Sequence, residues 1–289
     1  MYRKTINKAI HTKMVNWLKT ITDAQLKKDL RGCILVSGGA IASMLQNQSV
    51  NDFDVYITDV DVLKRLMVYY TQPVDLEVLD WRYDKAFVGG YEDVARNVAI
   101  RTLREGQLKT FVRNGGHKTT TAIEKGSYSV AFVSANAISL SDSVQIVTRF
   151  WGNCDTVHRT FDFIHATNYW TFKDGCVFNK EALESLLTQR LVYQGSLYPL
   201  TSIIRAKKFI KRGWNIGASD LLKIMFQIAE LDLRDIDTLT EQLIGVDVAY
   251  FSALLETLEG VNLKEVSNEF ICQMIDKSFE TTFGFNDEA

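Results

Sequence analysis

Proline is scarce in this sequence: only Pro73 and Pro199 occur among 289 residues, so no proline-rich linker divides the chain. The four cysteines and four histidines are scattered and include no Cys-x-x-Cys pair, which argues against a structural zinc site. Widely spaced thiols are typical of a reduced, intracellular protein. The sequence also has no apolar run of about 18 residues, so we predict no membrane-spanning helix and no membrane partner.

Neither sign of charge is in large excess. The formal net charge is −2, so no overall field draws the chain to nucleic acid, and any such contact must come from a local patch. Hydrophobic residues make up 46% and charged residues 24%, as in an ordinary soluble globular protein. With 289 residues, the chain is long enough for one large domain or two ordinary ones, each with its own core.

The most informative stretch begins with a short apolar run, Cys33–Val36, whose length fits a buried strand. Gly38 and Gly39 follow at once. Ala40–Gln46 then has apolar residues at helical spacing, and a second strand-like run, Phe53–Ile57, ends the stretch. The sequence therefore predicts a strand, a glycine turn, a short helix and a second strand in close succession.

This order suggests a site for a metal ion and a phosphate group. Because side chains alternate along a strand, Asp52 and Asp54 are expected on one face, and two carboxylates suit Mg²⁺. With a third carboxylate, such a site can hold two metals. Gly38 and Gly39 would let the backbone approach a triphosphate at the start of a helix, and Ser37 would add a hydroxyl donor.

The stretch resembles the nucleotidyltransferase superfamily that includes DNA polymerase beta, poly(A) polymerases and CCA-adding enzymes. The superfamily signature is a hydrophobic strand, Gly-Gly or Gly-Ser, a helix, and Asp-hydrophobic-Asp-hydrophobic. It is matched here by Val36-Ser37-Gly38-Gly39 and Asp52-Phe53-Asp54-Val55. The competing interpretation is a surface turn followed by an amphipathic strand whose outer face carries two aspartates.

The resemblance implies an enzyme that moves a nucleoside monophosphate from an NTP to an acceptor hydroxyl and releases pyrophosphate. It implies a two-metal Mg²⁺ site, with Mn²⁺ as a substitute. The acceptor would be the 3′ end of an RNA such as tRNA, or a protein side chain. The base, the acceptor, the use of a template and the oligomeric state are left open by the sequence.

A third carboxylate has two candidate locations. The segment Thr160–His165 places Asp162 between phenylalanines, which matches the third strand of the superfamily and makes Asp162 our candidate third metal ligand. In divergent and viral members, a strand with a leading glutamine precedes this element, as Val144–Val147 does here. The competitors are Asp75 and Glu77 on an expected strand over 74–79. Alternatively, Asp162 caps or pairs with a local group.

From Lys180 onward the pattern becomes helical. We therefore predict an α+β protein, with a catalytic domain of the nucleotidyltransferase type over residues 1–179 and an all-helical domain over 180–289. One helix, Pro199–Arg212, is strongly cationic, and we predict that three of its side chains bind the nucleotide's phosphates. These candidates are Arg205, Lys208 and Arg212. The alternative is a solvated cationic face.

Other elements are predicted from periodicity and turn signals. We expect helices over 5–29 and 60–70, a hairpin over 107–123 and strands over 128–140 and 144–149. Two segments, Phe161-Asp162-Phe163 and the helix that follows Ser196-Leu-Tyr-Pro199, resemble nucleotidyltransferase-like proteins encoded by bacteriophages. A phage-encoded member would act in the cytoplasm of a bacterial host.

Two other classes of function compete with the transferase. One is a catalytically silent nucleic-acid-binding or regulatory module on the same fold, which the lack of a third carboxylate would favour. The other is a structural protein whose helical domain binds a partner. Neither has a sequence signal as specific as the Gly-Gly and Asp-Phe-Asp stretch.

Overall fold

The computed structural model describes residues 2–71, 92–95, 98–104, 107–112, 116–118, 126–134, 136–243, 263 and 265–283. The chain forms two compact units, Met1–Gln194 and Gly195–Ala289. Helix α6 (Lys180–Thr188) belongs to the first unit, although the sequence analysis placed it in the helical domain. No helix in these described ranges is long and apolar enough to cross a membrane.

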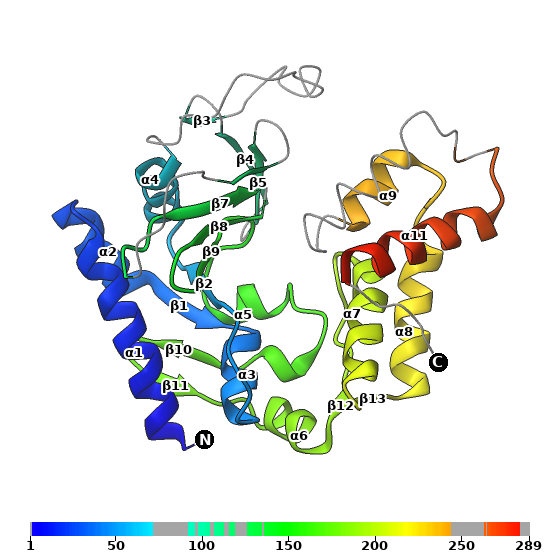
Figure 1. Cartoon of the computed structure of the whole chain (residues 1–289), viewed down its shortest axis with the longest axis horizontal. Helices are drawn as coiled ribbons and strands as arrows, with labels where there is room; N and C mark the ends of the chain where they lie inside the picture. The colour runs from blue at the N-terminus through cyan, green and yellow to red at the C-terminus, as the bar shows by residue number, and fades with distance from the viewer. Residues whose placement is uncertain are drawn as a thin grey trace. The chain divides into compact units, whose positions relative to one another are not determined.

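The first unit is built on a mixed sheet with the strand order β11-β10-β1-β2-β9-β8-β7-β6 (Figure 1). Only β2 and β9 pair in parallel, and every other neighbouring pair in this order is antiparallel. The strands of this sheet are β1 Ile34–Ser37, β2 Phe53–Ile57, β6 Gly116–Lys118, β7 Val130–Ser134, β8 Ala137–Leu140, β9 Val144–Val147, β10 Tyr169–Thr171 and β11 Gly175–Val177. A smaller antiparallel sheet contains β3 Glu92–Ala95, β4 Val98–Arg104 and β5 Gln107–Val112.

Helices cover one face of the mixed sheet and form the main core with it. Alternate strand residues such as Val36 and Val55 are fully buried there, together with Ile10 and Trp17 of the first helix. The other helical elements of this unit are short, apart from α4. The elements are α1 Arg3–Thr20, α2 Ala24–Cys33, α3 Gly39–Leu45, α4 Val60–Thr71, α5 Cys154–His158 and the 3₁₀ helix η3 Ile164–Ala166.

The opposite face of the sheet carries the remaining alternate residues. Leu35 and Tyr56 pack there against Val157 of α5, with Phe161 and Tyr169 at the edge of this smaller cluster. Asp54 shares this face because it is two residues from Tyr56 on the same strand. The candidate site is therefore on the face opposite α1.

Local sequence signals set several helix ends. The carboxylate of Asp23 accepts a hydrogen bond from Leu26 N at 2.9 Å and caps α2. Asp59 caps α4 in the same way, with acceptor distances of 2.9 Å to Asp61 N and 3.1 Å to Val62 N.

In its described residues, 195–243, 263 and 265–283, the second unit contains helices and one short strand, β13 (Asn215–Ile216). Its helices are α7 Pro199–Lys211, α8 Ala218–Ala229, α9 Ile236–Leu243 and α11 Asn268–Phe283. Pro199 occupies the first turn of α7, and Gly213 after its end has a φ of +84°, as predicted for these two residue types. A core around Leu239 and Leu263 joins α7, α9 and α11. The predicted α+β class, with a mixed sheet followed by helices, is confirmed.

Three sequence predictions of strands need correction. Residues 160–165 form a bend and the start of η3, with one isolated bridge from Phe163 to Tyr193. The hairpin expected over 107–123 is absent from the described pairings, because β5 pairs with β4 and β6 pairs with β7. The run Tyr128–Leu140 contains two antiparallel strands, β7 and β8. Part of the helical domain predicted over 180–289, residues 244–262, lies outside the described residues.

Candidate functional site

The turn between β1 and α3 lies directly against Asp54. Gly38 has a φ of +94° and donates its N–H to the carbonyl of Ala166 at 3.1 Å. A Cβ atom at Gly38 would lie 2.9 Å from Oδ2 of Asp54, so a side chain there would force the carboxylate to shift. The glycine thus allows both the backbone conformation and the close approach of the carboxylate. Gly39, by contrast, is exposed and has open space around its Cβ position.

The aspartate pair begins β2. Phe53 and Val55 are buried, whereas Asp54 between them is only partly buried, as alternation along the strand requires. Asp52 precedes the strand and its side chain is exposed overall, but the surrounding protein still displaces enough water to raise the pKa of its carboxyl group. A bound cation would oppose this effect and favour the charged form of the carboxyl group.

A polar row continues from Asp54 across the sheet. In the parallel pairing of β2 with β9, Asp54 is opposite Gln145, and Gln145 is opposite Ser139 of β8. Paired residues in adjacent strands point to the same face, so the amide of Gln145 lies beside the carboxylate of Asp54. An amide oxygen is a hard ligand that Mg²⁺ and related ions accept. The chemistry of this donor set fits a divalent cation.

Ser37 is fully buried, and its hydroxyl group is used within the protein. The hydroxyl group donates to the carbonyl of Asn168 at 2.9 Å, and Nε2 of His158 lies 2.9 Å from Oγ of Ser37. The serine hydroxyl donates its one proton to the carbonyl of Asn168. In the hydrogen bond between Ser37 and His158, we therefore assign Nε2–H of His158 as the donor. These contacts fix the glycine turn to α5 and to the segment after η3, and they differ from the expected role of Ser37 as a phosphate donor.

His158 is neutral near pH 7, since burial lowers its pKa from 6.5 to about 4, with a weak opposing effect of Asp155. In the unfolded chain the imidazole accepts a proton at its ordinary pKa, so lowering the pH from 6.5 towards 4 favours unfolding. We expect the free energy of unfolding, from urea titrations at about pH 7 and about pH 5, to fall less in His158→Gln than in the wild type. An equal fall in both proteins would contradict this assignment.

Asp162 lies in the bend before η3 and is 8% exposed. Its Oδ1 accepts a hydrogen bond from Phe163 N at 3.1 Å, and its charge acts on His165, whose pKa burial lowers to about 4. Within the described ranges, no three side chains of His, Cys, Asp or Glu form a metal-binding group. The structure therefore does not bring Asp162 together with Asp52 and Asp54 in such a group. The competing candidates Asp75 and Glu77 lie outside the described residues.

The predicted phosphate-binding cations are on α7 of the second unit. Arg205 and Lys208 are partly buried, and Arg212 is exposed with its guanidinium group 5.8 Å from the centre of the Phe209 ring. Trp214, considered as a base-stacking residue, is buried at 6% exposure and packs edge-on against Phe209.

Sequence reasoning found the glycine turn and the aspartates but missed the residues that fix them. His158 and Asn168 hold Ser37, yet neither stands in a recognisable motif. Gln145 was noted only as part of a strand, although it is paired with Asp54. These three contacts join residues about a hundred positions apart, so no local pattern reveals them.

A glycine turn that faces an aspartate pair across neighbouring strands is the arrangement that the sequence shares with the nucleotidyltransferase superfamily. Residues 8–189 match the model of the family described as "Gabija anti-defense 2 family protein", and the chain belongs to this family. One curated relative is "Gabija anti-defense 2" of Bacillus phage SPbetaL7, which is 20% identical over 249 residues. The match covers 85% of this chain and 50% of the relative, so the chain spans about half the relative's length.

Similar solved structures include two CCA-adding enzymes. The enzyme of Thermotoga maritima, complexed with tRNA, is 11% identical with a TM-score of 0.38, and the match covers 93% of this chain and 62% of that chain. The enzyme of Bacillus stearothermophilus, in complex with CTP, is 10% identical with a TM-score of 0.34, covering 80% and 48%. These TM-scores are low, and we infer nothing about the site from them.

Proposed function

We propose that this protein is a metal-dependent nucleotidyltransferase that moves a nucleoside monophosphate from an NTP to an acceptor hydroxyl and releases pyrophosphate. The observation that carries the proposal is the approach of Gly38 to Asp54, with 2.9 Å between the Cβ position and Oδ2. This contact places a side-chain-free turn, whose second glycine, Gly39, is exposed, beside a carboxylate that can hold a cation.

Asp52 and Asp54 are the proposed ligands of Mg²⁺, for which Mn²⁺ can substitute. When bound, the cation supplies electrophilic stabilisation of the phosphoryl oxygens. The residues of the chain position the substrate: Gly38 and Gly39 accommodate the phosphates, and Ser37 holds the turn in place through its internal hydrogen bonds. Arg205, Lys208 and Arg212 are proposed to bind phosphate groups of the nucleotide through charge-assisted hydrogen bonds.

The proposed third ligand is Asp162 or Gln145, and Asp75 and Glu77 stay as the competitors that the sequence offers. Asp162 is proposed from the sequence, and Gln145 because it is paired with Asp54. We expect Gln145→Leu to lower the transfer rate more than Asp162→Asn, because only the first change removes an oxygen beside the aspartate. Transfer rates with saturating NTP would be measured for both variants. A greater loss in Asp162→Asn, with unchanged thermal stability, would assign the role to Asp162 instead.

The proposal is tested by incubating the protein with each α-³²P-labelled NTP, Mg²⁺ or Mn²⁺, and total RNA together with cell protein. Label transferred to RNA or to protein supports the transferase and identifies the base and the class of acceptor. We propose an RNA 3′ end, such as that of tRNA, or a protein side chain as acceptor. No transfer with any nucleotide, together with no metal-dependent NTP binding, would contradict the proposal.

A second candidate is a catalytically silent nucleic-acid-binding or regulatory module. It is favoured by one observation: no group of three metal-binding side chains occurs within the ranges that the structure describes. The two candidates differ in nucleotide binding, because the silent module requires neither NTP nor metal. We propose that the transferase reaction, rather than binding alone, opposes the defence after which the family is named.

A further inference from the structure

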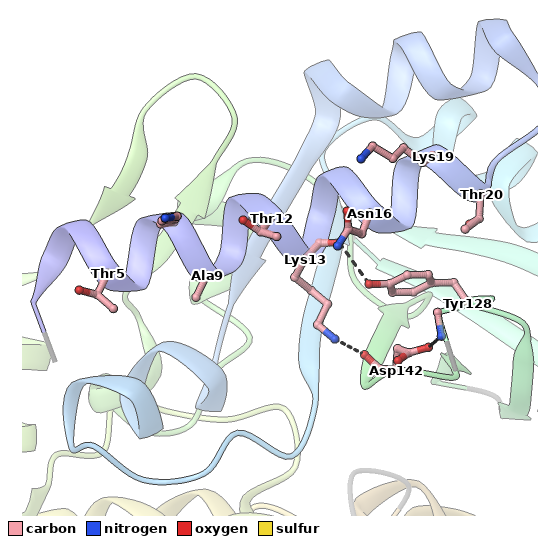
Figure 2. A pocket seen from close by; sticks show the side chains of 11 residues that line it. Thr5, Ala9, Thr12, Lys13, Asn16, Lys19, Thr20, Tyr128 and Asp142 are labelled. Atoms are coloured by element: carbon pink, nitrogen blue, oxygen red, sulfur yellow. Dashed lines mark hydrogen bonds between the residues drawn. The ribbon is translucent and has the colours of Figure 1, made fainter. Parts of the chain in front are cut away.

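A groove runs along α1 and is separate from the aspartate pair. Its volume is about 800 Å³, large enough for an extended ligand. Figure 2 shows one wall formed by α1, with Tyr128 and Asp142 on the other side. Because α1 packs against the face of the sheet opposite Asp54, this groove is not part of the candidate active site.

The lining of the groove is positively charged. Lys8, Lys13 and Lys19 line it together with a single carboxylate, Asp142, which gives a net charge of +2 on a chain whose formal net charge is −2. The sequence contains no aspartate or glutamate before Asp23. The local field therefore attracts an anion, although the field of the whole chain does not.

The lysines have different structural roles. Lys13 is partly buried, donates to the backbone carbonyl of Asp142 at 2.6 Å and lies 5.8 Å from the centre of the Tyr128 ring. Lys8 and Lys19 are exposed, and within the described ranges neither has a hydrogen-bond or ion-pair partner. Lys13 thus helps to build the far wall, while Lys8 and Lys19 keep their charges available at the edge of the groove.

The spacing favours a linear anion over a single phosphate. Lys8 and Lys19 are separated by eleven residues, or three helical turns, so they lie on one side of α1 about 16 Å apart. Thr12 and Asn16 lie between them and line the groove with short polar side chains. Lysine, threonine and asparagine are side chains that contact successive phosphates and sugars in protein–nucleic acid complexes.

The lining also distinguishes nucleic acid from an acidic protein segment. Protein interfaces have cores rich in aromatic residues, whereas nucleic acid interfaces are much more positively charged. Among the residues of this groove, the only aromatic one is Tyr128, which is 5% exposed and unable to stack on a ligand. We propose that the α1 groove binds the phosphodiester backbone of a single nucleic acid strand. This inference goes beyond the proposed transferase and does not depend on it.

The test is fluorescence anisotropy with the full chain and a labelled single-stranded RNA of about 20 nucleotides, a length that exceeds the groove. The variant is Lys8→Gln combined with Lys19→Gln. We expect binding about 25-fold weaker at about 0.1 M salt, and a salt slope smaller by about 1.4, because two phosphate contacts are lost. Both side chains are exposed, so the thermal unfolding midpoint should not change.

A matched control removes the same charge elsewhere in the unit. Lys28 and Lys173 are exposed and do not line the groove, so Lys28→Gln with Lys173→Gln should bind RNA nearly as the wild type does. Equal losses in both double variants, or no loss in either, would overturn the proposal. Tighter binding of polyglutamate than of RNA at the groove would also overturn it, in favour of an acidic protein.

The outcome is separable from that of the transferase proposal. An Asp52→Asn, Asp54→Asn protein should bind the RNA with the affinity of the wild type, because the aspartates lie on the other face of the sheet. If transfer is absent but the lysine variant loses RNA binding, the groove proposal is supported and the transferase proposal is contradicted. If transfer occurs and the lysine variant binds RNA as the wild type does, only the groove proposal is contradicted.

Discussion

Replacing Asp52 and Asp54 together by asparagine is expected to reduce nucleotidyl transfer by at least about a thousandfold. The change removes both negative charges of the cation site. The electrophilic stabilisation that a cation supplies is worth several kcal/mol, and a loss of about 4 kcal/mol lowers the rate about a thousandfold. The rate of label transfer from α-³²P NTP measures the loss. In cells that carry the defence named in the family description, the same variant should no longer restore phage plating.

Asp61→Asn is the matched control for this variant. Asp61 is exposed on α4, a few residues after β2, and its loss removes one carboxylate without touching the site. The control should keep the wild-type transfer rate and thermal stability. A double aspartate variant that folds and still transfers label at the wild-type rate would remove Asp52 and Asp54 from the mechanism.

Gly38→Ala is expected to impair stability as well as transfer, whereas Gly39→Ala should keep the stability of the wild type. At Gly38 a φ of +94° and a ψ of −151° are strained for any residue with a Cβ, at a cost of about 1–3 kcal/mol. The new methyl group would also displace Oδ2 of Asp54, which lies 2.9 Å from the Cβ position. We expect a thermal midpoint roughly 5 °C lower and a transfer rate about a hundredfold lower.

Gly39 provides the control because it is the adjacent glycine in the same turn. It begins α3 and has no atom within 4 Å of its Cβ position, so an alanine side chain fits there. Alanine also lowers the conformational entropy of the unfolded chain, which favours the folded state. Its thermal midpoint should equal or exceed that of the wild type. If Gly39→Ala were as damaging as Gly38→Ala, the loss would reflect the turn in general and not the contact with Asp54.

The part of the fold that the sequence predicts well depends on neighbouring residues. The helix caps at Asp23 and Asp59 are local in this sense, because each carboxylate and the N–H groups that donate to it are within three residues of each other. Residues 33–57 were predicted correctly as a strand, a glycine turn, a helix and a second strand for the same reason. The spacing of apolar residues that marks each element is visible within a few residues.

The segment around Asp162 was predicted incorrectly because its alternating pattern has two explanations. Phe161 packs against Tyr56, while Phe163 packs against Tyr193, so the two rings have separate neighbours in a bend. A strand would have given the same sequence of apolar and polar residues. The partners that decide between the two lie far away in the chain, and a sequence pattern does not contain them.

The neighbours of the aspartates were unpredictable for a related reason. Gln145 lies beside Asp54 because β2 and β9 pair in parallel, and about ninety residues separate them. The burial of Ser37 likewise depends on His158 and Asn168. The sequence predicted the strand, glycine turn and helix correctly, whereas the structural role of Ser37 depends on these distant contacts.

The most direct test of the account is a titration of Mn²⁺ followed by electron paramagnetic resonance, with and without NTP. We expect the wild type to bind Mn²⁺ together with NTP. The Asp52→Asn, Asp54→Asn variant should bind Mn²⁺ at least about a hundredfold more weakly, as expected when ligands of a metal site are lost. Equal Mn²⁺ binding by both proteins, or none by the wild type, would contradict the assignment of the metal site.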